Sequence, residues 1–280
     1  MIALTGGTFR MGSDRHYPEE APAHTETVGP FAIDRTPVTN ADFAAFVEAT
    51  GYTTLAERCP APADYPGADP TLLVAGSAVF TPPAAPPRGP ADWWIYRPGA
   101  HWRFPQADGR AAEPQHPVVH IALADAAAFA AWAGKSLPTE AEWEFAARGG
   151  REAGDYAWGD VFIPGGVPQA NTWHGRFPLE QVAVDGFSRT SPVSAFPANG
   201  YGLFDMIGNV WEWTMTPWNS GKPTRSCCTP GTSGTAAYAI KGGSHLCAPN
   251  YCRRYRPPAR QPQTADSPTS HIGFRCVRRS

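Results

Sequence analysis

The sequence predicts a mixed α+β fold with little regular secondary structure, and three observations indicate this class. Glycine and proline, with 28 and 31 copies, account for 59 of the 280 residues, well above ordinary usage, so loops must form much of the structure. Only short segments have the caps and apolar spacing of helices or strands. Ten tryptophans are many for this length, and such large side chains can fill a core that lacks regular layers.

The first of three predicted helices begins at Thr39 or Asn40, either of which is a suitable N-cap. Gly51 ends it, because glycine readily adopts the left-handed conformation of a C-cap. The apolar face carries Phe43, Phe46 and Val47.

The second and third helices are predicted in the middle of the chain. The second starts near Asp125 and ends at Gly134. The third starts with a capping box formed by Thr139 and Glu142 and ends at Gly149.

Strands and a long insertion complete the expected fold. Short strands are predicted at 31–33, 118–121 and 272–277. The stretch 54–117 is rich in proline and alanine, as linkers are, but it contains Trp93 and Trp94, whose side chains favour burial. We therefore expect a structured insertion, and residues 1–280 are expected to form one domain.

Composition excludes several classes of protein. Apolar residues make up 42% of the chain, charged residues 17%, and the formal net charge is −2. This balance excludes general disorder and indicates no affinity for nucleic acid or acidic membranes. No apolar run approaches the roughly 20 residues of a membrane span, and the N-terminal residues do not resemble a secretory signal peptide. We expect a cytoplasmic protein, with a monomer as the default state.

The cysteines are the most informative residues. Four of the six lie between positions 227 and 252, and such clustering in a reducing compartment suggests metal or redox chemistry. Cys247 and Cys252 would point to opposite faces of a straight strand, or lie about 140° apart on a helix. Only a bent backbone, which Pro249 can supply, brings them together. Cys59, Cys227 and Cys228 have no assigned role.

Two interpretations of the cysteine pair remain open on spacing alone. In the first, the pair has only a structural role, as a small disulfide or as two unrelated buried thiols. In the second, the two thiolates bind a metal ion. Zinc would need four ligands, and the chain offers no second pair with suitable spacing. Among first-row metals, two thiolates suit Cu(I) best, because this ion is soft and accepts low coordination.

Other polar residues suggest weaker possibilities. Ser244 and Tyr251 flank the pair with hydroxyl groups, although a turn serine and a half-buried tyrosine explain them equally well. A cluster of arginines at 253–260 favours internal salt bridges or a peptide-binding rim over RNA binding in a nearly neutral chain. His116 and His120 are interpreted as core histidines. No phosphate-binding loop, Gly-x-Gly-x-x-Gly or Gly-x-Ser-x-Gly motif is present.

Taken together, the motifs of the chain resemble those of the formylglycine-generating enzymes, the sulfatase-modifying factor family, in its actinobacterial form. The motifs are GGTFRMG at 6–12, TPVTN at 36–40, LPTEAEWE at 137–144, NGYGL at 199–203, GNVWEW at 208–213 and GFR at 273–275. They identify a superfamily that also contains non-catalytic modules and iron-dependent sulfoxide synthases. The cysteine pair within 241–256 is the feature that indicates the enzyme.

The resemblance implies a single C-type-lectin-like domain and a specific reaction. This reaction is the aerobic oxidation of one cysteine in a Cys-x-Pro-x-Arg segment of an unfolded sulfatase to Cα-formylglycine, with O2 and an external thiol as reductant. Cys247 and Cys252 would bind Cu(I), Ser244 and Tyr251 would be active-site hydroxyls, and Trp211 would form a wall of the oxygen pocket.

The resemblance also implies structural calcium and a peptide-binding surface. The first calcium would be bound by Asn171, Thr172, Asp185 and Phe187. The second would be bound by Asp205, Met206, Gly208 and Val210. Peptide contacts would come from Trp93, Trp94 and Arg260.

One departure and two alternatives follow from the resemblance. Cys276 faces Ala147 at the position of its expected partner, so a disulfide of secreted members is missing, which fits a cytoplasmic protein. The main alternative is a non-catalytic binding module of the same fold. A sulfoxide synthase is disfavoured, because those proteins carry an additional N-terminal helical domain with a His-x-x-x-His-x-Glu motif.

Overall fold

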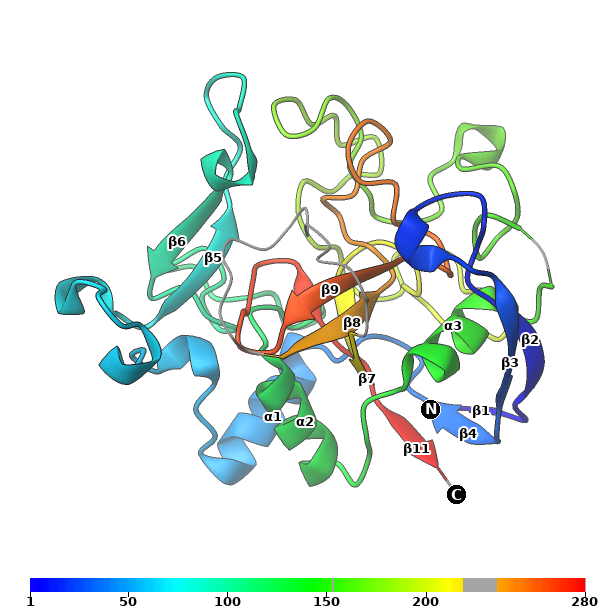
Figure 1. Cartoon of the computed structure of the whole chain (residues 1–280), viewed down its shortest axis with the longest axis horizontal. Coiled ribbons are helices and arrows are strands. Elements are labelled where there is room, and N and C mark those ends of the chain that lie inside the picture. Colours follow the sequence, from blue (N-terminus) through cyan, green and yellow to red (C-terminus); the bar gives the residue numbers. More distant parts are fainter. Residues whose placement is uncertain (153, 219–235, 280) are drawn as a thin grey trace.

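Short helices and strands are separated by long loops in the computed structural model, which describes residues 1–152, 154–218 and 236–279 (Figure 1). The α-helices of the described chain are α1 (Asn40–Thr50), α2 (Leu123–Trp132) and α3 (Glu140–Arg148). Its strands are β1 (Ile2–Leu4), β2 (Gly7–Met11), β3 (His24–Val28), β4 (Phe31–Ile33), β5 (Gly76–Phe80), β6 (Trp94–Pro98), β7 (Trp211–Pro217), β8 (Ala237–Lys241), β9 (Arg260–Thr264), β10 (Ile272–Gly273) and β11 (Val277–Arg279). The mixed α+β class is confirmed.

The sheets join segments that are far apart in the sequence. β4 pairs antiparallel with both β1 and β11, so the first and last strands share one sheet and the chain ends lie near each other (Figure 1). A four-stranded sheet has the order β10-β7-β8-β9, in which only β10 and β7 run parallel. β2 and β3 form one hairpin and β5 and β6 another. The β1-β4-β11 sheet therefore joins segments on both sides of the 54–117 insertion.

The predicted caps of α1 and α3 are confirmed. The Thr39 side chain accepts a hydrogen bond from the Asp42 amide at 3.1 Å, and the Asp42 carboxylate accepts one from the Thr39 amide at 3.1 Å. Thr139 and Glu142 form the same reciprocal pair at the start of α3. Both helices end at glycines in the left-handed conformation, as expected.

The predicted start of α2 was wrong by two residues. Asp125 is the third residue of the helix rather than its cap, and its carboxylate accepts a hydrogen bond from the Ala122 amide at 2.9 Å. An acidic residue at this position accepts a hydrogen bond from the amide of the N-cap residue, which is why it resembles a cap in the sequence.

Two predicted strands also differ from the structure. Residues 118–121 are buried but form no strand, because His120 adopts φ = 60° and so breaks the extended run. Its ring lies between Ser77 Oγ at 2.8 Å and Pro105 O at 2.9 Å, which confirms a core histidine. The 272–277 run is divided between β10 and β11, which belong to different sheets.

The 54–117 segment is structured, as predicted, and covers one side of the molecule. Its β5–β6 hairpin is joined to the rest of the chain by a bridge between Ala78 and Thr269. Trp93 and Trp94 are buried at 4% and 6% exposure. They belong to an apolar cluster that contacts the loop after β8, and the insertion therefore forms part of the surroundings of the cysteine pair.

None of the helices in the described part of the chain combines the length and apolar character that crossing a membrane requires.

A candidate two-thiol active site

The loop that carries the two cysteines starts directly after β8 with a sharp reversal. Gly242 and Gly243 adopt φ values of 95° and 73°, which few other residues tolerate. A Cβ atom on Gly243 would lie 2.8 Å from the carbonyl oxygen of Arg254. Glycine is therefore required here, because the two ends of the loop pass in direct contact.

Local hydrogen bonds then bring the two thiols together. The Cys247 amide donates to Ser244 O at 2.9 Å, and the Cys252 amide donates to Ala248 O at 3.0 Å. The two Sγ atoms lie 3.5 Å apart, and each cysteine is 2% exposed. This distance exceeds the roughly 2.05 Å of a disulfide bond, so these sulfurs are not bonded to each other. They are close enough to bind one ion.

A backbone amide and a guanidinium group lie close to the two sulfurs. The Ser244 amide lies 3.4 Å from Cys247 Sγ, and Arg254 Nη1 lies 3.7 Å from Cys252 Sγ. The Arg254 guanidinium also pairs with Glu19 and stacks 3.8 Å from the centre of the Tyr17 ring. The segment around Tyr17 thus holds a cationic group beside the pair.

Burial dominates the titration of nearby groups. It lowers the pKa of His245 to about 4, so this ring is neutral at pH 7 and its Nδ1 lies 2.8 Å from Asn209 O. Burial also raises the pKa of Tyr17, and the negative charge of Cys252 acts in the same direction. The positive charge beside the sulfurs therefore comes from Arg254 and not from the neighbouring histidine.

A cavity of about 10 Å³ lies beside the sulfurs, close to the space that one water-sized molecule occupies. It is lined by Trp93, Trp94, Phe177, Trp211, Ser244, Leu246, Cys247, Tyr251 and Cys252. The indole Nε1 atoms of Trp94 and Trp211 are buried without a hydrogen-bond acceptor among the described residues. The structure therefore brings together the cysteine pair and five other residues singled out in the sequence, namely Ser244, Tyr251, Trp211, Trp93 and Trp94.

A larger groove of about 540 Å³ opens on the other side of three of these side chains, Trp93, Phe177 and Tyr251. Phe177 stacks on Tyr251 with ring centres 4.6 Å apart and an angle of 14° between the planes. Trp93 meets Tyr251 edge-on at 5.6 Å. These rings separate the buried sulfurs from an open surface on which a polypeptide can lie.

The positions of Phe177 and Arg260 differ from what the sequence predicted. Phe177 was missed, because it lies 70 positions before Cys247 and its sequence surroundings give no signal of a shared cavity. Arg260 lines neither the cavity nor the groove. It lies on β9, where its Nη2 atom donates to Glu140 Oε2 at 2.8 Å.

The first predicted calcium set has the features of a cation site. Asn171 Oδ1 and Asp185 Oδ2 are buried and have no hydrogen-bond partner among the described residues, although His174 Nε2 lies 3.6 Å from Asp185 Oδ2. The other atoms of these groups are used: Asn171 Nδ2 donates to Arg189 O at 2.8 Å, and Asp185 Oδ1 accepts from the Phe187 amide at 3.1 Å. Burial raises the pKa of Asp185, and a bound cation would reverse that effect. Buried amide and carboxylate oxygens that accept no hydrogen bond are suitable ligands for calcium.

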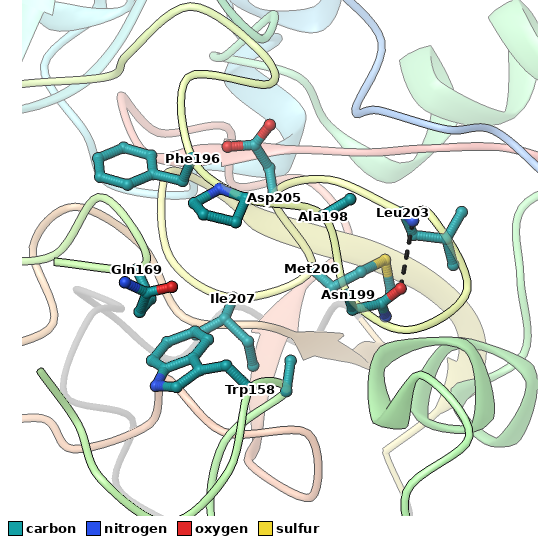
Figure 2. A pocket seen from close by; sticks show the side chains of 11 residues that line it. Trp158, Gln169, Phe196, Ala198, Asn199, Leu203, Asp205, Met206 and Ile207 are labelled. Carbon is teal, nitrogen blue, oxygen red and sulfur yellow. Dashed lines mark hydrogen bonds between the residues drawn. The ribbon is translucent and has the colours of Figure 1, made fainter. Parts of the chain in front are cut away.

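The second predicted set fits less well. Both carboxylate oxygens of Asp205 accept hydrogen bonds, from the Ser194 amide at 2.7 Å and from Asn209 Nδ2 at 3.4 Å. Arg275 Nη2 also donates to the Asp205 carbonyl at 3.2 Å. Asp205 and Met206 line a small pocket (Figure 2). Its volume is about 30 Å³, and neither Cys247 nor Cys252 lines it. Calcium at this second set therefore stays a prediction from the sequence.

Histidine, cysteine and acidic side chains do not converge elsewhere. Over 1–152, 154–218 and 236–279, no group of three or more of them is arranged to hold a metal ion. Cys227 and Cys228 lie outside the described residues. Cys276 is buried, and burial strongly raises its pKa, so it is an inert core thiol. Cys59 is exposed and lines neither the cavity nor the groove.

Comparisons with known proteins identify the family of the chain. Residues 1–280 match the sulfatase-modifying factor enzyme 1-like domain. The chain is 55% identical to the formylglycine-generating enzyme of Mycobacterium tuberculosis over 290 aligned residues, covering 99% of this chain and 97% of that protein. It is 47% identical to the formylglycine-generating enzyme of Streptomyces coelicolor, covering 99% and 88% of the two chains. The solved structure of PvdO from Pseudomonas aeruginosa aligns with a TM-score of 0.66 at 27% identity, covering 99% and 93%. The chain therefore belongs to the sulfatase-modifying factor enzyme family.

Proposed function

We propose that this protein is a copper-dependent formylglycine-generating oxidase that activates sulfatases. Its substrate is an extended sulfatase segment of the form Cys-x-Pro-x-Arg, and its other reactants are O2 and a thiol reductant. The observation that carries the proposal is the 3.5 Å separation of Cys247 Sγ and Cys252 Sγ beside a small aromatic cavity.

The proposed reaction balances in atoms and electrons. The thiol side chain of the substrate cysteine, O2 and two reductant thiols give an aldehyde, hydrogen sulfide, water and one disulfide of the reductant. The substrate cysteine supplies two electrons and the reductant thiols supply two, which together reduce O2 fully. No further co-reactant is needed.

Cys247 and Cys252 would hold the metal. Cu(I), when bound, supplies redox chemistry toward O2 and accepts a further soft ligand such as the substrate thiolate. The donors on the sulfurs, the Ser244 amide and Arg254 Nη1, stabilise the negative charge that these ligands carry.

The aromatic cavity would exclude bulk water and orient the small reactant. Its volume suits a molecule of the size of water or O2. Trp211 is fully buried, and its indole N–H lacks an acceptor among the described residues, so it is available to a polar species in the cavity. Holding the reactant beside the substrate thiol makes the hydrogen abstraction effectively intramolecular.

We further propose that one calcium ion at Asn171, Thr172, Asp185 and Phe187 stabilises the 171–187 loop. This loop supplies Phe177 to the wall of the cavity, and the Trp173 amide donates to Cys247 O at 3.0 Å. Calcium would thus support the site without taking part in the chemistry. A cytoplasmic location and a monomeric state remain predictions.

The decisive experiment is mass spectrometry of a Cys-x-Pro-x-Arg peptide incubated with Cu(I)-loaded protein, O2 and a thiol. We expect the mass loss of cysteine-to-aldehyde conversion. Cys252→Ser should abolish it, whereas Cys59→Ser should leave it unchanged, because that thiol is exposed and lies outside the cavity. Unchanged turnover of Cys252→Ser would refute the assignment. Absence of both copper uptake and turnover in the unmodified protein would favour a non-catalytic module.

A further inference from the structure

The groove outside the aromatic wall has an unbalanced charge. Arg88 and Arg176 both line it, while its other lining residues are proline, glycine, leucine, aromatic residues and Asn250. No aspartate or glutamate of the described chain lines it. Both arginines are exposed, and neither forms an ion pair with a described residue.

One acidic residue close in sequence, Asp92, interacts electrostatically with Arg88 but does not line the groove. Asp92 uses its carboxylate on the backbone, where it accepts from the Arg88 amide at 2.6 Å and from the Gly89 amide at 3.3 Å. Glu180, four positions after Arg176, makes no ion pair within the described chain and does not line the groove. The lining of the groove therefore contains two guanidinium groups and no carboxylate.

The backbone of the groove is held in place, so the two charges are presented by fixed elements. Asn250 Nδ2 donates to Phe177 O at 3.3 Å, and the Phe177 amide donates to Asn250 Oδ1 at 3.4 Å. On the opposite rim, the 3-10 turn Pro90–Asp92 closes the loop between β5 and β6, which extends beyond the hairpin (Figure 1). Proline-rich walls and aromatic rings suit an extended polypeptide.

We propose that this groove binds an acidic segment of the substrate, on the N-terminal side of the cysteine that is oxidised. This inference rests on the proposed function. Trp93, Phe177 and Tyr251 line both the groove and the sulfur cavity, so we infer that a chain with its cysteine at the sulfurs places one of its flanks in the groove.

The charges of the substrate determine whether the segment before or the segment after its cysteine lies in the groove. In Cys-x-Pro-x-Arg the arginine follows the cysteine, and placing it beside Arg88 and Arg176 would oppose like charges with no acidic residue of the groove lining to offset them. The segment before the cysteine has no such conflict. Aspartate or glutamate there would meet two guanidinium groups, which bind carboxylates well.

The test is a peptide series around one constant Cys-x-Pro-x-Arg centre. Two flanking positions before the cysteine carry Glu, Gln or Lys, and a fourth peptide carries the two Glu residues after the arginine. We expect kcat/KM to be about 2- to 5-fold higher for each N-terminal acidic residue, as for exposed ion pairs. The gain should lie in KM, because the groove does not touch the reacting atoms. It should shrink at 0.5 M NaCl, because the pairs are exposed.

Charge reversal identifies the groove as the source. Arg176→Glu and Arg88→Glu should each reduce the preference for Glu, and the double variant should prefer the Lys peptide. Arg110→Glu is the matched control, since that arginine is 90% exposed and lies outside the groove. Arg176→Lys should keep most of the preference.

Equal kcat/KM across the N-terminal series, a preference that survives both reversals, or a gain from the C-terminal acids alone would overturn the proposal. Conversion of the Gln peptide tests the proposed function separately. If no peptide is converted, fluorescence anisotropy of labelled peptides still decides: Glu must bind more tightly than Gln and Lys, and this order must reverse in the double variant.

Discussion

Glu20 and Arg256 form a two-point ion pair in which both side chains are fully buried, although 236 positions separate them. Arg256 Nη1 donates to Glu20 Oε2 at 2.8 Å, and its Nε donates to Arg253 O at 3.1 Å. The pair thus joins the N-terminal segment to the end of the loop that carries Cys247 and Cys252. This buried contact holds the end of that loop against the N-terminal segment.

Glu20→Gln should destabilise the protein strongly, because it leaves the Arg256 guanidinium buried without a counter-charge. We expect the free energy of unfolding in urea to fall by about 3–5 kcal/mol. Glu26→Gln is the control, because Glu26 is partly exposed, and it should change stability by less than about 0.5 kcal/mol. Equal unfolding midpoints for the two variants would contradict a structural role for the pair.

Trp211→Phe should slow the reaction more than it weakens the fold. The substitution keeps a ring in the cavity but removes an N–H that has no acceptor among the described residues. If this N–H stabilises charge on the reacting oxygen species, kcat should fall by about 100-fold with little change in KM.

Trp213→Phe is the matched control for that experiment. Trp213 is equally buried, but its Nε1 donates to Ile121 O at 2.8 Å and it does not line the cavity. It should cost about 1–3 kcal/mol of stability, because a buried carbonyl loses its donor, and leave kcat nearly unchanged. The reverse pattern in the two variants would remove Trp211 from the mechanism.

Calcium should raise the melting temperature by binding to a site that includes Asp185. At a free concentration 100 times its dissociation constant, the ion would add about 2.7 kcal/mol to the stability of the folded state. Asp185→Asn should abolish most of this gain in thermal unfolding, whereas Asp108→Asn, at an exposed position, should keep it. A melting temperature that does not respond to calcium or a chelator would exclude the site.

The free energy of unfolding should fall in acid because His120 binds a proton more readily in the unfolded chain than in the folded one. Burial lowers the pKa of this ring to about 4, whereas in the unfolded chain it is about 6.5. Between these values the unfolded state binds more protons, so the free energy of unfolding decreases as pH falls from about 6.5 to 4. The loss amounts to at most about 3 kcal/mol.

The His120 effect is isolated by comparing variants. Buried carboxyl groups such as Asp125 and Asp205, whose pKa values are raised by burial, act in the opposite sense but are shared by all variants. His245 and His271, whose pKa values burial also lowers, remain in every variant. His120→Asn should therefore make the pH profile of urea unfolding less steep, and His24→Asn, at an exposed position, should not. Parallel profiles for the unmodified protein and His120→Asn would show that this histidine does not titrate as described.

Local interactions were predictable from the sequence because they join residues close along the chain. The capping boxes at Thr39 and Thr139, and the glycines that end both helices, needed only the spacing of three or four residues. The error at α2 was also local, since an acidic residue at the third position of a helix and one at its cap both accept hydrogen bonds from backbone amides at the helix start, although from different ones. Short motifs were likewise sufficient to indicate the family.

Contacts between distant segments were decided by the tertiary structure alone. Spacing left Cys247 and Cys252 as a disulfide, unrelated thiols or a metal pair, and only the structure shows their sulfurs 3.5 Å apart in a loop whose ends meet at Gly243 and Arg254. Phe177 reaches the cavity from another loop, and Arg260 is drawn away from it by Glu140. Such placements depend on packing and charge pairing summed over the whole chain, and no short stretch of sequence encodes them.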